Sequence, residues 1–139
     1  MSTLKVETIQ NTSALYSSTP HQIEQGRAKA HIEMKGTSTI TINSSFNISS
    51  IIDNGAGKYE ANLSITMSST TYCVVGGSSQ SDNRNDNVMG FHPYTATKIR
   101  MYSWNDTGTS TAGEDATFVS AAVFGELACL LYTSPSPRD

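Results

Sequence analysis

Charge, cysteine and long hydrophobic runs are all scarce in this sequence. Charged residues make up 15% of its 139 residues, against roughly 25% in typical soluble domains. The net charge of −3 argues against a nucleic-acid partner, because phosphate binding requires a clustered basic face. No apolar run approaches the roughly 20 residues of a membrane-spanning helix, and the first ten residues hold no apolar secretory core. We therefore expect neither membrane insertion nor a signal peptide.

Patterns that mark catalysis or metal binding are also missing. The chain contains no Gly-x-Ser-x-Gly motif of the kind that presents a serine nucleophile. His21, His31 and His92 fall in different segments, without the spacing of metal ligands. A carboxylate pair for glycoside hydrolysis would have to come from separate loops, as with Asp86 and Glu114. We expect a non-enzymatic protein without a cofactor.

The two cysteines, Cys73 and Cys129, suggest no disulfide framework. Cys73 stands in a short apolar run and is most simply a small buried hydrophobic residue. Cys129 opens the C-terminal segment CLLYTSPSPRD, which resembles the in-frame translation of a widely used sequencing adapter. We expect residues 126–139 to be a non-native tail. The alternative is a genuine disordered tail, since TSPSP has the composition of a linker.

Hydroxyl and amide residues replace the missing charge, and the chain holds 20 Ser, 17 Thr and 9 Asn. Such residues suit solvent-facing strand positions and turns. From residue 28 apolar side chains recur at every second position, with Lys29, His31 and Glu33 expected on the solvent side. The same alternation continues through residues 40–48 and, after the turn DNGAG, through residues 59–67. Asn-Gly favours a tight hairpin turn.

Further strands are predicted at 72–75, 88–91, 97–104 and 116–124, with a turn at 92–94. About seven short strands with turn signals between them favour an all-β fold, an antiparallel β-sandwich. We expect residues 27–125 to form this head domain. Its predicted core consists of the inward-facing residues Ile32, Ile42, Phe46, Tyr59, Leu63, Ile65, Val74, Ile99, Met101 and Val123.

We expect residues 1–26 to form a separate attachment or oligomerisation segment. Residues 4–9 alternate in polarity, which is consistent with a short strand or, equally, with a disordered arm. Thr19 and Gln22 have the spacing of a capping box around Pro20, and Gly26 suits a helix exit. A short helix is therefore expected between them.

Three motifs in the first half resemble the short tail-fibre or receptor-binding proteins of bacteriophages, especially those of aquatic phages. They are MSTLKVETIQNTS at the start, SSTPHQIEQGRAKA, and SFNISSIIDNGAGKY. The resemblance runs motif by motif over residues 1–75 and more loosely to Gly125. It implies a homotrimer in the virion tail that is assembled in the host cytoplasm, contacts other tail proteins and adheres to a bacterial surface glycan or protein. A structural virion protein without receptor contact, such as a fibre connector or decoration protein, is the alternative.

Receptor contacts are expected from the polar loops 78–87 and 105–115, because loops on a rigid scaffold commonly carry binding. The acidic and amide side chains of the first loop are also a weak match to a calcium site, although they lack the pattern of an EF-hand. On the strand between the loops, Tyr102 and Trp104 share an outward face with Lys98 and Arg100. Three roles stay open for these aromatics: packing between subunits, packing on the chain's own core, or glycan contact. The candidate receptor-binding residues are Asp82, Asn83, Arg84, Asn85, Asp86, Tyr102, Trp104, Asn105 and Asp106.

Overall fold

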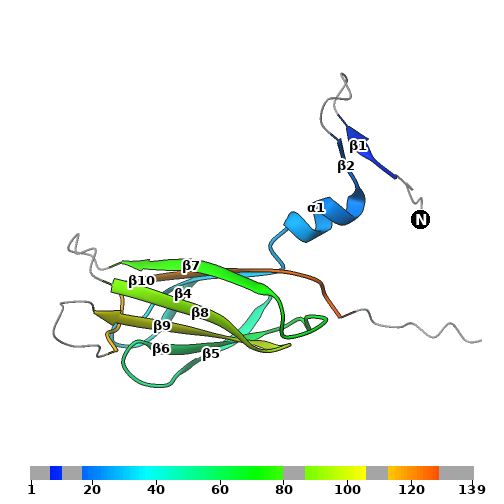
Figure 1. The fold of residues 1–139 in the computed structure, drawn as a ribbon. Coiled ribbons are helices and arrows are strands. Elements are labelled where there is room, and N and C mark those ends of the chain that lie inside the picture. The colour runs from blue at the N-terminus through cyan, green and yellow to red at the C-terminus, as the bar shows by residue number, and fades with distance from the viewer. Residues whose placement is uncertain (1–6, 11–16, 80–86, 106–112, 129–139) are drawn as a thin grey trace, which may run out of the picture.

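The computed structural model describes residues 7–10, 17–79, 87–105 and 113–128, in which two four-stranded sheets enclose one core. In hydrogen-bonded order, the first sheet, here called the β3 sheet, contains β4 (Thr41–Phe46), β3 (Ala30–Lys35), β10 (Phe118–Phe124) and β7 (Cys73–Ser79). The second, called the β9 sheet, contains β5 (Ile48–Asp53), β6 (Lys58–Leu63), β9 (Lys98–Asn105) and β8 (Asn87–Thr95). All neighbouring strands run antiparallel (Figure 1). The predicted antiparallel β-sandwich is confirmed.

The sandwich has eight strands rather than about seven, because residues 40–48 do not form one stretch. The chain turns at Asn47, which has a φ of 56°, and passes from β4 in one sheet to β5 in the other. Asparagine is one of the few residues besides glycine that visit this conformation readily. Its side-chain Nδ2 donates a hydrogen bond of 2.7 Å to the backbone oxygen of Lys29, which ties the crossing to β3.

The predicted core is largely correct. Ile65 and Val74 are partly buried. Six further predicted residues are fully enclosed between the sheets: Ile32, Tyr59, Leu63, Ile99, Met101 and Val123.

The prediction is wrong for Ile42 and Phe46, whose exposed fractions are 42% and 48%. Met34 pairs with Ile42 but Glu33 pairs with Ser44, so β4 carries one extra residue, a β-bulge. An extra residue reverses the face on which all following side chains lie. Phe46 therefore lies on the outer surface opposite His31, and the two rings stack with centroids 5.9 Å apart. Ile42 keeps the inward orientation of Met34 but stands on an edge strand, where it is incompletely covered.

Cys73 and Lys29 also differ from expectation. Cys73 is exposed, because it begins β7 on the outer side of the β3 sheet, opposite Phe124. Lys29 is only 4% exposed, since its Nζ turns under the N-terminal helix and binds Glu24 Oε1 at 2.6 Å as well as the Glu24 backbone oxygen. This contact lowers the pKa of Glu24 below its ordinary value.

The N-terminal segment projects from one end of the sandwich (Figure 1). It consists of the short hairpin of β1 (Ile9–Gln10) with β2 (Ser17–Ser18), followed by helix α1 (Pro20–Gly26). The predicted capping box is confirmed: Gln22 N donates to Thr19 Oγ1 at 3.2 Å, and Thr19 N donates to Gln22 Oε1 at 2.9 Å. No residue of α1 is buried. The helix also donates a hydrogen bond of 2.9 Å from Gln25 Nε2 to Glu126 Oε1. Residues 126–128, which the sequence assigned to the tail, pair with the sandwich, because Ser68 N donates to the Glu126 oxygen and Ala128 N to the Thr66 oxygen, both at 2.8 Å.

Candidate functional site

The outer face of β9 carries the combination of cations and aromatics that the sequence predicts. Ile99 and Met101 are fully buried, so the alternate residues Lys98, Arg100 and Tyr102 point away from the core. They are partly exposed, as is Trp104. Tyr102 and Trp104 therefore lie on the outside of the sandwich and do not belong to the core between its sheets.

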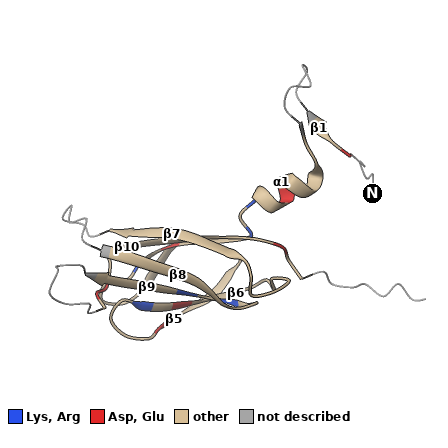
Figure 2. Ribbon diagram, in the orientation of Figure 1, with Lys and Arg blue, Asp and Glu red and all other residues tan. Residues whose placement is uncertain are grey.

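An ion-pair cluster occupies the middle of this face. Glu60 on β6 lies opposite Arg100 and is only 6% exposed. Its carboxylate accepts a hydrogen bond of 2.8 Å from Lys98 Nζ and one of 3.2 Å from Arg100 Nε. The bond from Lys98 lowers the pKa of Glu60 below its ordinary value, against the opposing effect of burial. Charged segments of β6 and β9 lie together in this sheet (Figure 2). Both basic side chains are thus engaged with one carboxylate.

Two aromatic residues of β8 that the sequence assigned to a turn extend this surface. β8 continues through Pro93, which is tolerated because β8 is an edge strand. The register shifts between Pro93 and Thr95, which leaves Tyr94 over Arg100, with the guanidinium carbon 3.3 Å from the ring centroid. His92 stacks on Tyr102 with centroids 5.6 Å apart and an angle of 4° between the rings. Strand alternation from Val88 would have placed His92 outward, but no sequence signal marked the bulge.

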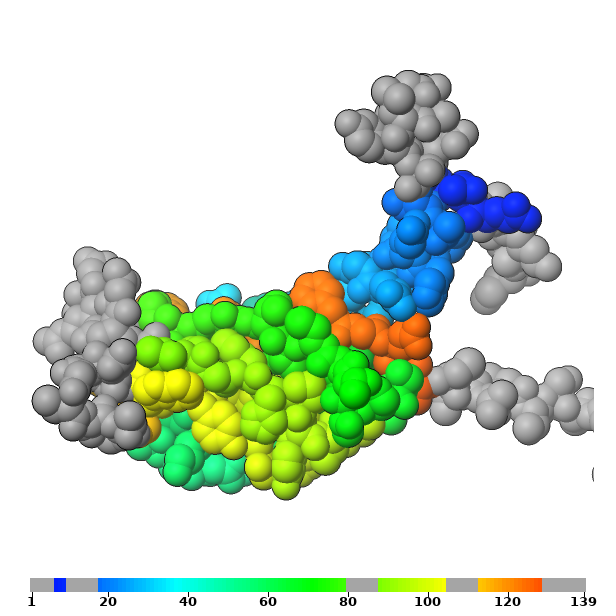
Figure 3. Space-filling model, in the orientation of Figure 1, coloured from blue at the N-terminus to red at the C-terminus, as the bar shows by residue number. Residues whose placement is uncertain are grey.

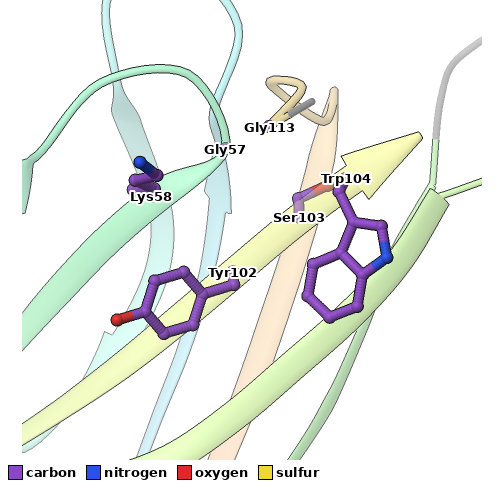
Figure 4. A pocket seen from close by; sticks show the side chains of 6 residues that line it. All are labelled: Gly57, Lys58, Tyr102, Ser103, Trp104 and Gly113. Atoms are coloured by element: carbon purple, nitrogen blue, oxygen red, sulfur yellow. The ribbon is translucent and has the colours of Figure 1, made fainter. Parts of the chain in front are cut away.

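Beside these rings lies a hollow of about 300 Å³ (Figure 4). Lys58, Tyr102 and Trp104 contribute long side chains to its wall, and Lys58 is the direct cross-strand neighbour of Tyr102. Its lining residues, which define the hollow below, are Gly57, Lys58, Tyr102, Ser103, Trp104 and Gly113.

Glycine is required at two positions of the hollow because backbone segments approach each other closely there. Gly57 has a φ of 65°, and a Cβ on it would collide with the Ser103 backbone oxygen. A Cβ on Gly113 would collide with the backbone oxygen of Ala56. Gly57 N donates to Asp115 Oδ1 at 2.8 Å, and its oxygen accepts from Ser103 N at 2.7 Å. At these two positions the hollow is therefore lined by backbone rather than by side chains.

Contacts with β8 and with the core fix the position of the residues around the hollow. The Trp104 ring lies over Gly90 of β8, where a Cβ would come within 3.3 Å of two ring carbons. Tyr59, inside the sandwich, donates a hydrogen bond of 2.9 Å to Asp115 Oδ1, the same oxygen that binds Gly57. Burial, and then this bond, raise the pKa of the Tyr59 hydroxyl. The wall and the turn below it are therefore anchored to the core.

Among the predicted site residues, the structure brings Tyr102 and Trp104 together at the hollow. Asn105 ends β9. The remaining candidates lie outside the described residues and stay predictions: Asp82, Asn83, Arg84, Asn85, Asp86 and Asp106. The sequence analysis did not single out Lys58, and it assigned Tyr94 to a turn.

Within the described ranges, no three or more His, Cys, Asp or Glu residues form a group that could hold a metal ion. Within the same ranges, no helix has the length and apolar character needed to cross a membrane. Comparison with protein-family models, with curated proteins and with solved structures finds no significant match.

Proposed function

We propose that this chain is a phage tail-fibre protein whose β-sandwich head attaches, without catalysis, to a glycan on the bacterial host surface. The observation that carries the proposal is the hollow on the outer face of the β9 sheet, which combines two aromatic rings of β9 with Lys58 of β6. β9 ends on the side of the sandwich opposite α1 (Figure 1). A head held by its N-terminal segment would thus present the hollow at its far end. The resemblance of the three N-terminal motifs to phage fibres supplies the biological setting.

The chemistry of the hollow suits a sugar. The faces of pyranose rings carry C–H groups that pack on aromatic rings, while hydroxyl groups require donors and acceptors nearby. Tyr102 and Trp104 each combine an apolar ring with a polar end, as residues at recognition surfaces often do. Small-ligand sites are typically concave and mostly apolar, with a few polar groups that fix orientation. In Figure 3 the N-terminal segment projects away from the surface of β8 and β9 and does not cover it.

Weak single sites are compatible with firm attachment when several copies act together. A trimeric fibre would present three heads, and linked binding events raise avidity without any new contact. The N-terminal segment is suited to such assembly, since α1 has no buried residue in the single chain and Ile23 is 39% exposed. A helix of seven residues is marginal alone, and neighbouring copies would cover it. Light scattering on the purified protein should give the mass of a trimer, and a monomer would remove this part of the proposal.

A glycan array with fluorescently labelled protein tests the adhesive function. We expect binding to a subset of bacterial glycans, and a loss of about tenfold or more on Trp104→Ala. Phe118→Ala is the matched control, because Phe118 is an exposed aromatic on the outer side of the other sheet. Loss of binding in both variants, or no glycan bound by the wild-type protein, would contradict the proposal.

A structural virion protein without receptor contact is the second candidate, and the β3 sheet supplies an observation in its favour. Phe46, His31, Ala122 and Val75 lie opposite one another across its four strands. Phe46 and Val75 are 48% and 46% exposed, so this row would suit packing against another subunit. In that role Tyr102 and Trp104 would also be covered by neighbours, and the assembled protein would bind no glycan on the array.

A further inference from the structure

We infer that the hollow binds a sugar residue that carries a carboxylate, and that Lys58 determines this specificity. The inference rests on the proposed function and names the ligand class of the same site. It follows from the charge balance of the β9 sheet, from the position of Lys58 and from the size of the hollow.

The charges on the outer face of the β9 sheet do not cancel. Among the described residues of this face, the charged side chains are Lys58, Glu60, Lys98 and Arg100. Glu60 holds both Lys98 and Arg100. Within the described part of the chain, Lys58 makes no ion pair and no side-chain hydrogen bond. Asp115 is the carboxylate bound to the lining residue Gly57, and its Oδ1 accepts hydrogen bonds from Gly57 N and from the Tyr59 hydroxyl rather than from Lys58. The protein as a whole has a net charge of −3, so an ammonium group that no described residue pairs with, beside two aromatic rings, is a local exception that favours an anionic ligand.

Lys58 stands where it reaches a ligand held by the aromatic rings. Directly opposed residues on antiparallel strands have Cβ atoms about 4.5–5.5 Å apart, and Lys58 is directly opposite Tyr102. Figure 4 shows Lys58, Tyr102 and Trp104 on different sides of the hollow, with Gly57 and Gly113 above them in this view. A ring packed on the aromatic side chains would thus have its substituents within range of the ammonium group.

The volume and the lining residues of the hollow restrict the class of ligand further. A volume of about 300 Å³ is at the lower end of small-ligand sites, which fits one sugar unit of a longer glycan. A single lysine balances the single charge of a carboxylate. Phosphate groups are usually held by several donors at once, such as bidentate arginines or helix N-termini. An inorganic anion would gain nothing from the two aromatic rings, whereas an acidic sugar uses both features.

Capsular polysaccharides that contain uronic acids supply matched probes, because chemical reduction of their carboxyl groups yields the neutral sugar in the same chain. Binding of the full-length protein is measured to each native polysaccharide and to its reduced form. We expect reduction to weaken wild-type binding about tenfold, and Lys58→Met to weaken binding of the native form to the level of the reduced one. Lys58→Arg keeps the charge and should retain the preference.

Lys35→Met is the control, because Lys35 is an exposed strand lysine on the outer side of the other sheet. This variant should bind both forms of the polysaccharide as the wild type does. Raising the salt concentration should weaken binding of the native form more than of the reduced form. Equal wild-type binding of native and reduced polysaccharides overturns the inference and leaves glycan adhesion standing. A preference that survives in Lys58→Met also overturns it. If neither form nor any array glycan is bound, the proposed function itself fails.

Discussion

Replacing Gly57 by alanine should destabilise the sandwich far more than the same replacement at Gly55, two residues earlier in the turn. Both glycines have positive φ, 102° at Gly55 and 65° at Gly57. An alanine at either position therefore carries backbone strain of about 1–2 kcal/mol. The space around them differs: a Cβ on Gly55 meets nothing within 4 Å, whereas a Cβ on Gly57 collides with the backbone oxygen of Ser103 and approaches Glu114 N to 2.7 Å.

The collision at Gly57 is costly because its partners are backbone atoms that cannot rotate away. Relief requires the turn to move from β9, which breaks the bond from Ser103 N to the Gly57 oxygen and the bond from Gly57 N to Asp115. Each such bond contributes about 0.5–1.5 kcal/mol net. Together with the φ strain, Gly57→Ala should lower the free energy of unfolding by roughly 2–5 kcal/mol, against about 1–2 kcal/mol for Gly55→Ala.

Urea denaturation of the two variants and the wild type measures this difference, with the slope of free energy against urea expected to stay constant. A loss of roughly 2–5 kcal/mol is a large part of the stability of an ordinary domain, so Gly57→Ala should unfold at a clearly lower urea concentration. Equal losses in the two variants would refute the close approach of the turn to β9, and with it the geometry of the hollow.

Three further predictions concern the core, the ion-pair cluster and the C-terminal segment. Ile99→Ala should cost about 2–5 kcal/mol in urea denaturation because Ile99 is fully buried, whereas Ile42→Ala, at an exposed site, should cost less than about 1 kcal/mol. Because the pKa of Glu60 is lowered in the folded state, its stabilising effect is complete above its unfolded pKa of about 4.3 and is lost as the pH falls through the folded value. The stability difference between wild type and Glu60→Gln should therefore shrink between neutral pH and pH 3. Deletion of residues 129–139 should change stability by less than about 0.5 kcal/mol, and a loss beyond about 1 kcal/mol would show that the segment belongs to the native structure.

Hydrophobic alternation sufficed to predict the fold class and most of the core, because period two is a direct consequence of strand geometry. It failed at β4, where one extra residue near Asn43 reverses the face of Phe46. A β-bulge of this kind has no reliable sequence signature, since serine and asparagine fit either conformation. The same limitation applies to Tyr94, which another register shift places over Arg100.

The candidate site was predictable only in part, because its geometry also depends on contacts between distant segments. The outward direction of Tyr102 and Trp104 follows from the alternation along one strand. The hollow depends on long-range approach, because Gly57 meets Ser103 and Gly113 meets Ala56 across different segments. The burial of Glu60 likewise requires two basic residues from a neighbouring strand. No local pattern in the sequence contains these pairings.

The position of the hollow and its chemistry are set by different parts of the structure. Backbone contacts of Gly57 and Gly113 shape the hollow, and side chains at these two positions would collide with the backbone oxygens of Ser103 and Ala56. Lys58 and Tyr102 lie on the outer face, where replacement removes no core contact. Substitutions at surface positions outside the core usually change stability by less than about 0.5 kcal/mol. If the hollow binds host glycans, its ligand preference can therefore change by substitution at these positions while the sandwich that carries it stays folded.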